Sequence, residues 1–251
     1  MWAKGLLAAL AAVSSVSAHG YVRDWTIGGK TYVTLLPAGS PNFTAPVEGI
    51  GRALLNGDYP MTDPLSNAMA CNVGAYPAPK YANVTAGTNV TARWTSWPHV
   101  GPMYTYMAYC PNGKDCSDFY GWEKAAWFKI EEAAFIPYVA EWNPSGVAWA
   151  TQKMYDDGMR WTFQIPKCIK NGPYLIRHET MAVHNSQVLG GAQFYPNCAQ
   201  VWVSGGTGKL KPKLVKLPGD IKPTDPGVLF ERQELPFDYT VPGSRPIVCP
   251  A

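Results

Sequence analysis

Two histidines of this chain could together bind a metal ion, and each stands in a context that leaves it accessible. His19 follows Val16-Ser17-Ala18, a small-residue cleavage site after an apolar run, so residues 1–18 are typical of a secretory signal. Removing the signal makes His19 the first residue of the mature chain. His99 stands just before Gly101-Pro102, at the end of an expected connection, where a rigid scaffold can aim it outward.

An N-terminal histidine offers a metal two nitrogens, its imidazole and its free α-amine. The amine has an ordinary pKa of about 7.7–8.0, so a metal can displace its proton near neutral pH. Nitrogen-rich sites favour Cu(II) among the divalent first-row metals. One further imidazole would complete a brace of three nitrogens. Taken alone, His19 is as well explained by its chance position after the cleavage site, and His99 by exposure in a loop.

Composition favours a turn-rich, β-rich chain over a helical one. The 251 residues include 24 Gly and 23 Pro, aromatic residues reach 13%, and charged residues are only 16%. The formal net charge is +3 and no block of like charge occurs, so nucleic acid and acidic membranes are poor partners. An even number of cysteines in an exported chain predicts a disulfide framework, but the sequence does not choose among the pairings.

The sequence carries three N-glycosylation sequons, which begin at Asn42, Asn83 and Asn89. Asn89 lies in an expected strand, so Asn42 and Asn83 are the predicted acceptors. No second apolar stretch is long enough to span a bilayer, and the tail lacks a hydrophobic anchor signal. We therefore expect a secreted, extracellular protein.

Strand patterns recur along the mature chain, with no convincing alternation of strands and helices. They lie at residues 89–94, 103–109, 161–165, 174–184 and 192–203. Residues 19–80 are expected to form long loops, the pattern of 122–135 does not decide its structure, and 204–251 are expected to wrap the surface. The sequence predicts one all-β domain over residues 19–251, without an appended binding module. Its expected fold is an immunoglobulin-like or fibronectin III-like antiparallel β-sandwich with long surface loops.

Several motifs share one order along the chain. They are His19 after a signal, Asp63-Pro64 before Ala70-Cys71-Asn72, His99-x-Gly-Pro, Arg177-His178-Glu179 leading to His184, Gly191-Ala192-Gln193-Phe194-Tyr195-Pro196-x-Cys198, and Tyr239-x-x-Pro-Gly. Together they resemble the cellulose-active fungal lytic polysaccharide monooxygenases of auxiliary activity family nine, formerly glycoside hydrolase family 61. The resemblance covers essentially the whole mature chain.

The resemblance implies that one copper ion is bound by the imidazole and amine of His19 and the imidazole of His99, with Tyr195 at the axial position. Gln193 and His184 would lie around the copper and manage protons there. The implied enzyme is a monooxygenase that cleaves β-1,4-glucans such as cellulose at C1 and/or C4. It would use O2 or H2O2 with an external electron donor such as cellobiose dehydrogenase or a phenol. We expect it to act as a monomer.

Because a crystalline polysaccharide cannot enter a cleft, its rings would stack on exposed aromatic residues of a flat face. The resemblance makes Tyr239 a candidate, and Trp25 is a weaker one for which a core role is about as consistent. His178 is expected to be structural. The resemblance also implies a disulfide between Cys71 and Cys198, accompanied by the pairs Cys110–Cys116 and Cys168–Cys249.

Two other functions fit parts of the sequence. A glycoside hydrolase needs two carboxylates about 5 to 9.5 Å apart across a cleft. The pairs Asp156-Asp157 and Glu131-Glu132 are poor candidates, because neighbours in a strand point to opposite faces. A secreted copper- or cellulose-binding protein without turnover is the second alternative, although nothing in the motifs indicates a loss of activity.

Overall fold

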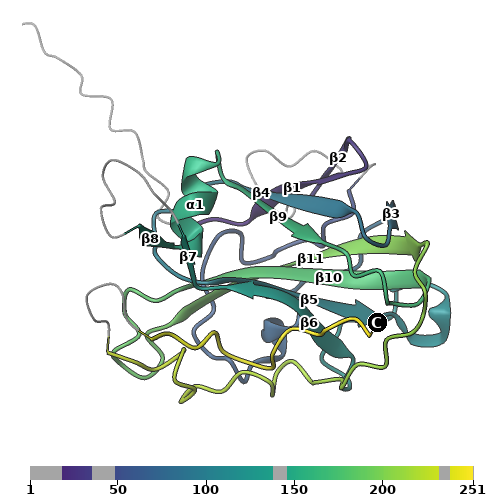
Figure 1. Ribbon diagram of the computed structural model, residues 1–251. Coiled ribbons are helices and arrows are strands. Elements are labelled where there is room, and N and C mark those ends of the chain that lie inside the picture. Colours follow the sequence, from purple (N-terminus) through teal and green to yellow (C-terminus); the bar gives the residue numbers. More distant parts are fainter. Residues whose placement is uncertain (1–18, 36–48, 138–145, 232–237, 251) are drawn as a thin grey trace, which may run out of the picture.

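The computed structural model describes residues 19–35, 49–137, 146–231 and 238–250. Two β-sheets stack face to face, and long connections run around them (Figure 1). The expected signal at residues 1–18 and the sequon at Asn42 lie outside the described residues. In the described part of the chain, no helix has the length and apolar character that a bilayer span requires.

The first sheet has the strand order β2-β1-β4-β9, and the second has the order β3-β11-β10-β5-β6. The first consists of β1 (Val22–Ile27), β2 (Lys30–Val33), β4 (Asn89–Trp94) and β9 (Arg160–Gln164). The second consists of β3 (Ala82–Thr85), β5 (Met103–Tyr109), β6 (Trp127–Ala133), β10 (Gly172–Ala182) and β11 (Gln193–Ser204). Neighbouring strands are antiparallel except β3 and β11, which are parallel. The predicted β-sandwich is confirmed, with one parallel pair at an edge.

Smaller elements lie outside the two sheets. They are the pair β7 (Phe135–Pro137) and β8 (Val147–Trp149), the helix α1 (Ala150–Asp156), and the 3-10 turns Asn67–Met69 and Pro111–Gly113. The helix α1 follows β8 directly, and its N-cap residue makes no side-chain capping bond. Because the usual start signal of a helix is missing, the sequence did not reveal α1.

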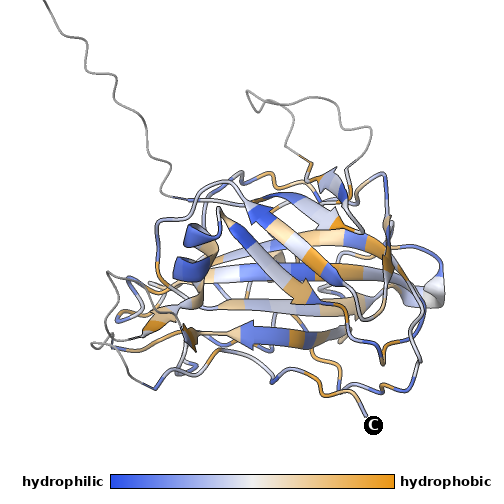
Figure 2. Cartoon of the chain, turned by 45° about the horizontal axis from the view of Figure 1, so that its top comes forward, coloured by the Kyte–Doolittle hydropathy of each residue, from blue (hydrophilic) through white to orange (hydrophobic). Residues whose placement is uncertain are grey.

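Alternation between buried and more exposed side chains explains the core between the sheets. In β4, Val90, Ala92 and Trp94 are buried, while the intervening side chains are exposed or half-buried. Figure 2 shows apolar and polar residues alternating along the strands, and a polar helix α1. From the second sheet, Met107 and Ile176 belong to the same buried cluster. Large side chains from both sheets therefore hold the sandwich together.

The expectation of loops throughout residues 19–80 is wrong for β1 and β2, which form a hairpin. Gly28 and Gly29 connect these strands with φ values of 56° and 78°. Positive φ at both turn residues suits a two-residue hairpin, because such a turn matches the twist of the strands. The register shifts between Val22 and Asp24, so the strand lacks the clean period of two that would have revealed it.

The C-terminal segment covers the outer edge of the second sheet, as expected for a surface wrap. Val215 exchanges backbone hydrogen bonds with Trp127 of β6, and Ile247 donates one to Lys129. In Figure 1 this segment runs beside β6. The disulfide between Cys168 and Cys249 joins its end to the segment before β10.

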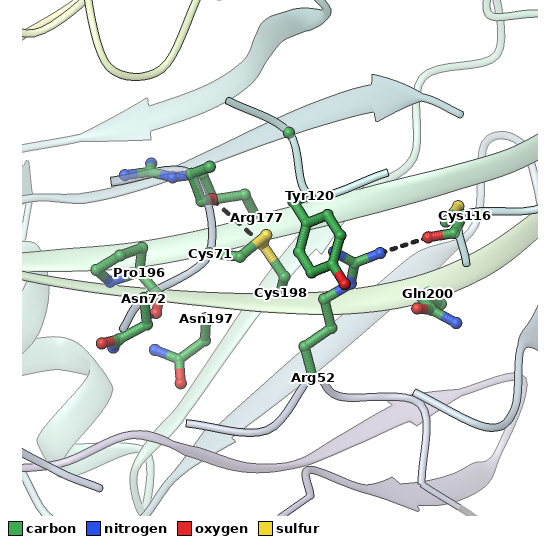
Figure 3. Close-up of a disulfide and its surroundings, with 12 residues drawn as sticks. Arg52, Cys71, Asn72, Cys116, Tyr120, Arg177, Pro196, Asn197, Cys198 and Gln200 are labelled. Atoms are coloured by element: carbon green, nitrogen blue, oxygen red, sulfur yellow. Dashed lines mark hydrogen bonds between the residues drawn. A yellow bond between two sulfur atoms is a disulfide. The ribbon is translucent and has the colours of Figure 1, made fainter. Parts of the chain in front are cut away.

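The remaining disulfides are Cys110–Cys116 and Cys71–Cys198, so all three predicted pairs are confirmed. Cys71–Cys198 joins an early loop to β11 across a sequence separation of 127 residues. Figure 3 shows this bridge beside Asn72, whose Nδ2 donates to the Pro196 carbonyl at 3.1 Å. The loop is thus fixed against the strand that carries Tyr195.

Candidate functional site

His19 lies just before β1 and is held against the connection between β4 and β5. Its carbonyl oxygen accepts a hydrogen bond from Ser96 Oγ at 3.0 Å, and the Thr95 N–H donates to the Tyr21 carbonyl at 3.0 Å. A Cβ on Gly20 would lie 1.9 Å from the Ser96 carbonyl oxygen. Only glycine permits this approach, which explains why glycine follows His19.

His99 and His184 lie face to face beside this segment. Their ring centroids are 4.2 Å apart and the ring planes differ by 14°. The Val183 N–H donates to the Val100 carbonyl at 3.1 Å, so the residues next to both histidines are joined by the backbone. The end of β10 therefore sets the distance between the two imidazoles.

Gly101 explains the His-x-Gly-Pro motif. A Cβ at this position would lie 1.8 Å from the Met181 carbonyl oxygen of β10. The Gly101 N–H donates to Thr151 Oγ1 of α1 at 2.9 Å, and the Thr151 N–H donates back to the Gly101 carbonyl at 3.3 Å. The missing side chain lets the loop that carries His99 lie directly on β10.

Tyr195 and Gln193 complete this group from one face of β11. The Tyr195 hydroxyl donates to Gln193 Oε1 at 2.9 Å. The ring of Tyr195 lies 6.1 Å from the ring of His19 and 4.6 Å from that of Trp97. Burial raises the pKa of the Tyr195 phenol, and the charge of Asp58 adds to this effect, so the hydroxyl is protonated at neutral pH. The structure therefore brings together the five residues that the resemblance placed around copper.

The rings of His19 and His99 have centroids 6.1 Å apart. Metal–imidazole bonds of about 2.0 Å on each side, together with the two ring radii, span about this distance. Among the residues described, no group of three or more His, Cys, Asp or Glu side chains is arranged to hold a metal. The α-nitrogen of His19, which is a peptide nitrogen until the preceding residues are removed, would supply a third nitrogen. The two imidazoles and this amine fit copper.

Trp25 is not a substrate-binding residue, and this prediction is wrong. Its side chain is 0% exposed and lies between the sheets. The indole Nε1 donates to Thr34 Oγ1 at 3.0 Å. Its place in β1, whose inward face is covered by the second sheet, buries it.

Tyr239 is half-buried on the surface formed by the C-terminal segment. Its hydroxyl donates to the Gly227 carbonyl at 2.7 Å, and its ring packs edge-on against Trp149 and Phe230 at 4.9 and 5.2 Å. Burial raises the pKa of this phenol well above its ordinary value. Tyr239 is thus held rigidly, and its role in binding substrate stays a prediction.

The sequence did not reveal Tyr59, which stands beside His19. Its side chain is 64% exposed, and the two rings are stacked at 6.1 Å with an angle of 29° between their planes. Met61 and Phe194 exchange backbone hydrogen bonds of 3.0 and 2.7 Å, which fix the loop next to Gln193. No local pattern predicts that pairing, because its partners are far apart in the sequence.

His178 is structural, as expected. It is fully buried, its Nδ1 lies 2.9 Å from Thr105 Oγ1, and its ring stacks on Phe163 with centroids 5.4 Å apart. Burial, with a smaller contribution from the charge of Arg177, lowers the pKa of His178 to about 3. The imidazole is therefore neutral at physiological pH.

The carboxylate pairs do not form a hydrolase site. Glu131 Oε1 accepts hydrogen bonds from Thr105 and Trp161, whereas Glu132 pairs with Lys129 and Arg245. Asp156 and Asp157 lie at the end of α1 rather than in a strand, where Gln152 binds Asp156 and Lys153 binds Asp157. The assignment of this pair to a strand is therefore wrong. Each carboxylate is nevertheless bound by a different side chain of α1.

The two described sequons are both in strands, at Asn83 in β3 and Asn89 in β4, and both asparagines are exposed. Strand membership therefore does not distinguish them, and the preference for Asn83 loses its original reason.

The family model described as Auxiliary Activity family 9 (formerly GH61) matches residues 19–239. The chain is similar to AA9 family lytic polysaccharide monooxygenase F of Botryotinia fuckeliana, with 36% identity over 248 residues that cover 94% of this chain and 95% of the relative. It is also similar to AA9 family lytic polysaccharide monooxygenase B of Malbranchea cinnamomea, with 37% identity over 251 residues that cover 97% of each chain.

Among solved structures, the chain is similar to the extended catalytic domain of H. jecorina LPMO9A. The TM-score is 0.78 at 29% sequence identity, and the match covers 90% of each chain. The fold, the histidine pair and the family match agree. The chain belongs to Auxiliary Activity family 9, whose members are copper-dependent lytic polysaccharide monooxygenases.

Proposed function

We propose that the mature chain cleaves cellulose or a related β-1,4-glucan by oxidation at C1 and/or C4. The observation that carries this proposal is the group formed by His19, His99 and Tyr195, in which the two histidine rings lie 6.1 Å apart. The family match begins at residue 19, which supports secretion with removal of residues 1–18 and an N-terminal histidine. We propose that residues 19–251 form one domain and that the mature protein is a monomer.

When bound, copper supplies the redox chemistry that activates O2 or H2O2 with electrons from an external donor. The chain contributes position and proton control. Ser96 holds the carbonyl of His19, and β10 holds His99 against His184. Tyr195 keeps its proton and donates it in a hydrogen bond to Gln193 Oε1, which leaves the amide N–H groups of Gln193 available to hydrogen-bond a reacting oxygen.

Aromatic side chains support the choice of a glucan. The exposed ring of Tyr59 lies beside His19, and Tyr239 is fixed on the C-terminal surface. Sugar rings present C–H faces that stack on such side chains, and fixed rings lose little entropy on binding. We propose Tyr59 and Tyr239 as contacts for the polysaccharide, and cellobiose dehydrogenase or a phenol as the electron donor.

The test is mass spectrometry of soluble products from swollen cellulose, after incubation with copper-loaded mature protein with and without ascorbate. We expect oligosaccharides with aldonic acid or C4-ketone ends only when the reductant is present. A His99→Ala variant with an unchanged unfolding temperature is the matched control and should release none. Unoxidised oligosaccharides without reductant would instead indicate a hydrolase. Binding of both copper and cellulose without any product would indicate a binding protein.

A further inference from the structure

Trp202 is a large aromatic residue exposed on the outer side of the second sheet. Its side chain is 41% exposed, while Val201 and Val203 on either side are buried. Along β11, at about 3.3 Å per residue, Trp202 lies on the order of 23 Å from Tyr195. Trp202 is therefore distant from the predicted copper site. An exposed tryptophan presents a large apolar face, and covering this face with another group is favourable because it removes apolar surface from water.

Asn83 is the residue next to Trp202 on the neighbouring strand. The parallel register of β3 and β11 places Asn83 directly opposite Trp202. In β3, Ala82 and Val84 are buried while Asn83 and Thr85 are exposed. Paired residues share a face of the sheet, and adjacent strands are about 4.8 Å apart. The Asn83 amide and the Trp202 indole therefore lie side by side on the outer face.

Asn83-Val84-Thr85 is also an N-glycosylation sequon, and its asparagine and threonine are both on the exposed face. We propose that Asn83 carries an N-linked glycan whose first N-acetylglucosamine stacks on the indole of Trp202. The Asn83 Nδ2 forms a bond to the anomeric carbon of the lipid-linked oligosaccharide donor, the bond from that carbon to the diphosphate oxygen breaks, the lipid diphosphate leaves with the electron pair, and the amide releases one proton. No group is oxidised or reduced in this step.

This contact has a structural consequence for β3. The strand has four residues and lies at the edge of its sheet, where β11 is its one partner strand among the described residues. An edge strand exposes backbone N–H and C=O groups that can pair with another chain. A sugar bound to Asn83 and resting on Trp202 links β3 to β11 on the outer face. It also covers the exposed indole.

The chain contains a matched internal control in the sequon Asn89-Val90-Thr91. Asn89 is likewise exposed at the start of a strand, and the residues that follow it are the same as those after Asn83. Its partner across β4 and β9 is Gln164 instead of a tryptophan. A glycan at Asn89 thus lacks the stacking surface at the paired position.

The experiment uses copper-loaded protein secreted by a fungal host that attaches N-glycans. Mass spectrometry of peptides first measures the occupancy of Asn83. Thermal unfolding is then compared for Asn83→Gln in three backgrounds: Trp202, Trp202→Phe and Trp202→Thr. We expect Asn83→Gln to lower the unfolding temperature by about 2–4 °C with Trp202 or phenylalanine present, and to have no such effect with threonine. Asn89→Gln should change the unfolding temperature equally in all three backgrounds.

An unmodified Asn83 in the secreted protein would overturn the proposal. So would an equal effect of Asn83→Gln with Trp202 and with Trp202→Thr. If a Trp202 variant is not secreted, the wild-type protein can be treated with an endoglycosidase that leaves one N-acetylglucosamine. This trimmed protein should retain the stability and indole fluorescence of the glycosylated form, whereas full removal by an amidase should change both. Identical behaviour of the two products contradicts stacking by the first sugar.

Discussion

Replacing Glu131 by Gln should stabilise the protein above neutral pH. Burial raises the pKa of Glu131 from 4.5 to about 7, and hydrogen bonds from Thr105 and Trp161 offset only part of this effect. The folded state therefore binds the proton more tightly than the unfolded state does. The resulting stability is fully present below about pH 4.5 and is lost as the pH rises through about 7.

The magnitude follows from the same pKa values. A tenfold change in proton affinity corresponds to about 1.4 kcal/mol, so the ionised carboxylate of Glu131 lowers the stability by about 3 kcal/mol at pH 8. Both hydrogen bonds to this side chain end on one oxygen, Oε1, at 2.7 Å from Thr105 and 3.1 Å from Trp161. The amide oxygen of Gln can accept both bonds, so Glu131→Gln keeps the contacts and removes the charge.

The assay is urea unfolding of copper-free mature protein with intact disulfides, at pH 5 and at pH 8. Wild type should lose more stability between these pH values than Glu131→Gln does. At pH 8, the free energy of unfolding of Glu131→Gln should exceed that of wild type by about 3 kcal/mol. Glu132→Gln is the control, because it removes the carboxylate charge that pairs with the fully buried Lys129 and should destabilise the protein at both pH values. Parallel losses in wild type and Glu131→Gln would refute the reasoning.

Three further predictions concern the copper site. Gly101→Ala should lower the stability by about 1–3 kcal/mol and weaken copper binding, because its Cβ would lie 1.8 Å from the Met181 carbonyl oxygen. Thermal unfolding measures the stability and calorimetric titration measures the copper affinity. A copper affinity equal to that of wild type would contradict the prediction. Retaining Ala18 before His19 should reduce copper affinity by at least tenfold and change the electron paramagnetic resonance spectrum, since the amine becomes a peptide nitrogen; an unchanged spectrum would exclude the amine as a ligand. Tyr59→Ala should weaken binding to cellulose by about three- to tenfold with unchanged copper affinity. Pull-down experiments measure binding to cellulose, and titration measures copper affinity. Binding to cellulose equal to that of wild type would show that Tyr59 does not contact the substrate.

How far the sequence predicts this fold depends on how local each signal is. The bounds of β4 and β5 agree with the prediction because apolar residues alternate or run without interruption between clear breaks. The hairpin of β1 and β2 was missed because β1 is irregular near Val22, where its pairing with β4 shifts register. Trp25 was placed wrongly because residue type alone does not say which side of a strand faces the other sheet.

The residues of the candidate site also differ in whether a local sequence signal marks them. His19 and His99 are predictable because a cleavage motif and a Gly-Pro turn mark them locally. Tyr59 was not predictable, because it reaches His19 only through the pairing of Met61 with Phe194. The exposure of Asn89 was not predictable either, since a strand pattern does not tell which residues at the start of the strand face solvent.

The strap formed by Val215 and Ile247 along β6 has a consequence for biogenesis. During synthesis, β6 leaves the ribosome long before these residues exist, so its outer edge has no partner of its own chain. Any nascent chain that pauses in this interval exposes a strand edge to its neighbours in a crowded secretory compartment. The disulfide between Cys168 and Cys249 can form only after residue 249 has been translated, 81 residues after Cys168. Efficient export is therefore expected to depend on the translation of residues 215–249, although the predicted copper ligands His19 and His99 lie far earlier in the sequence.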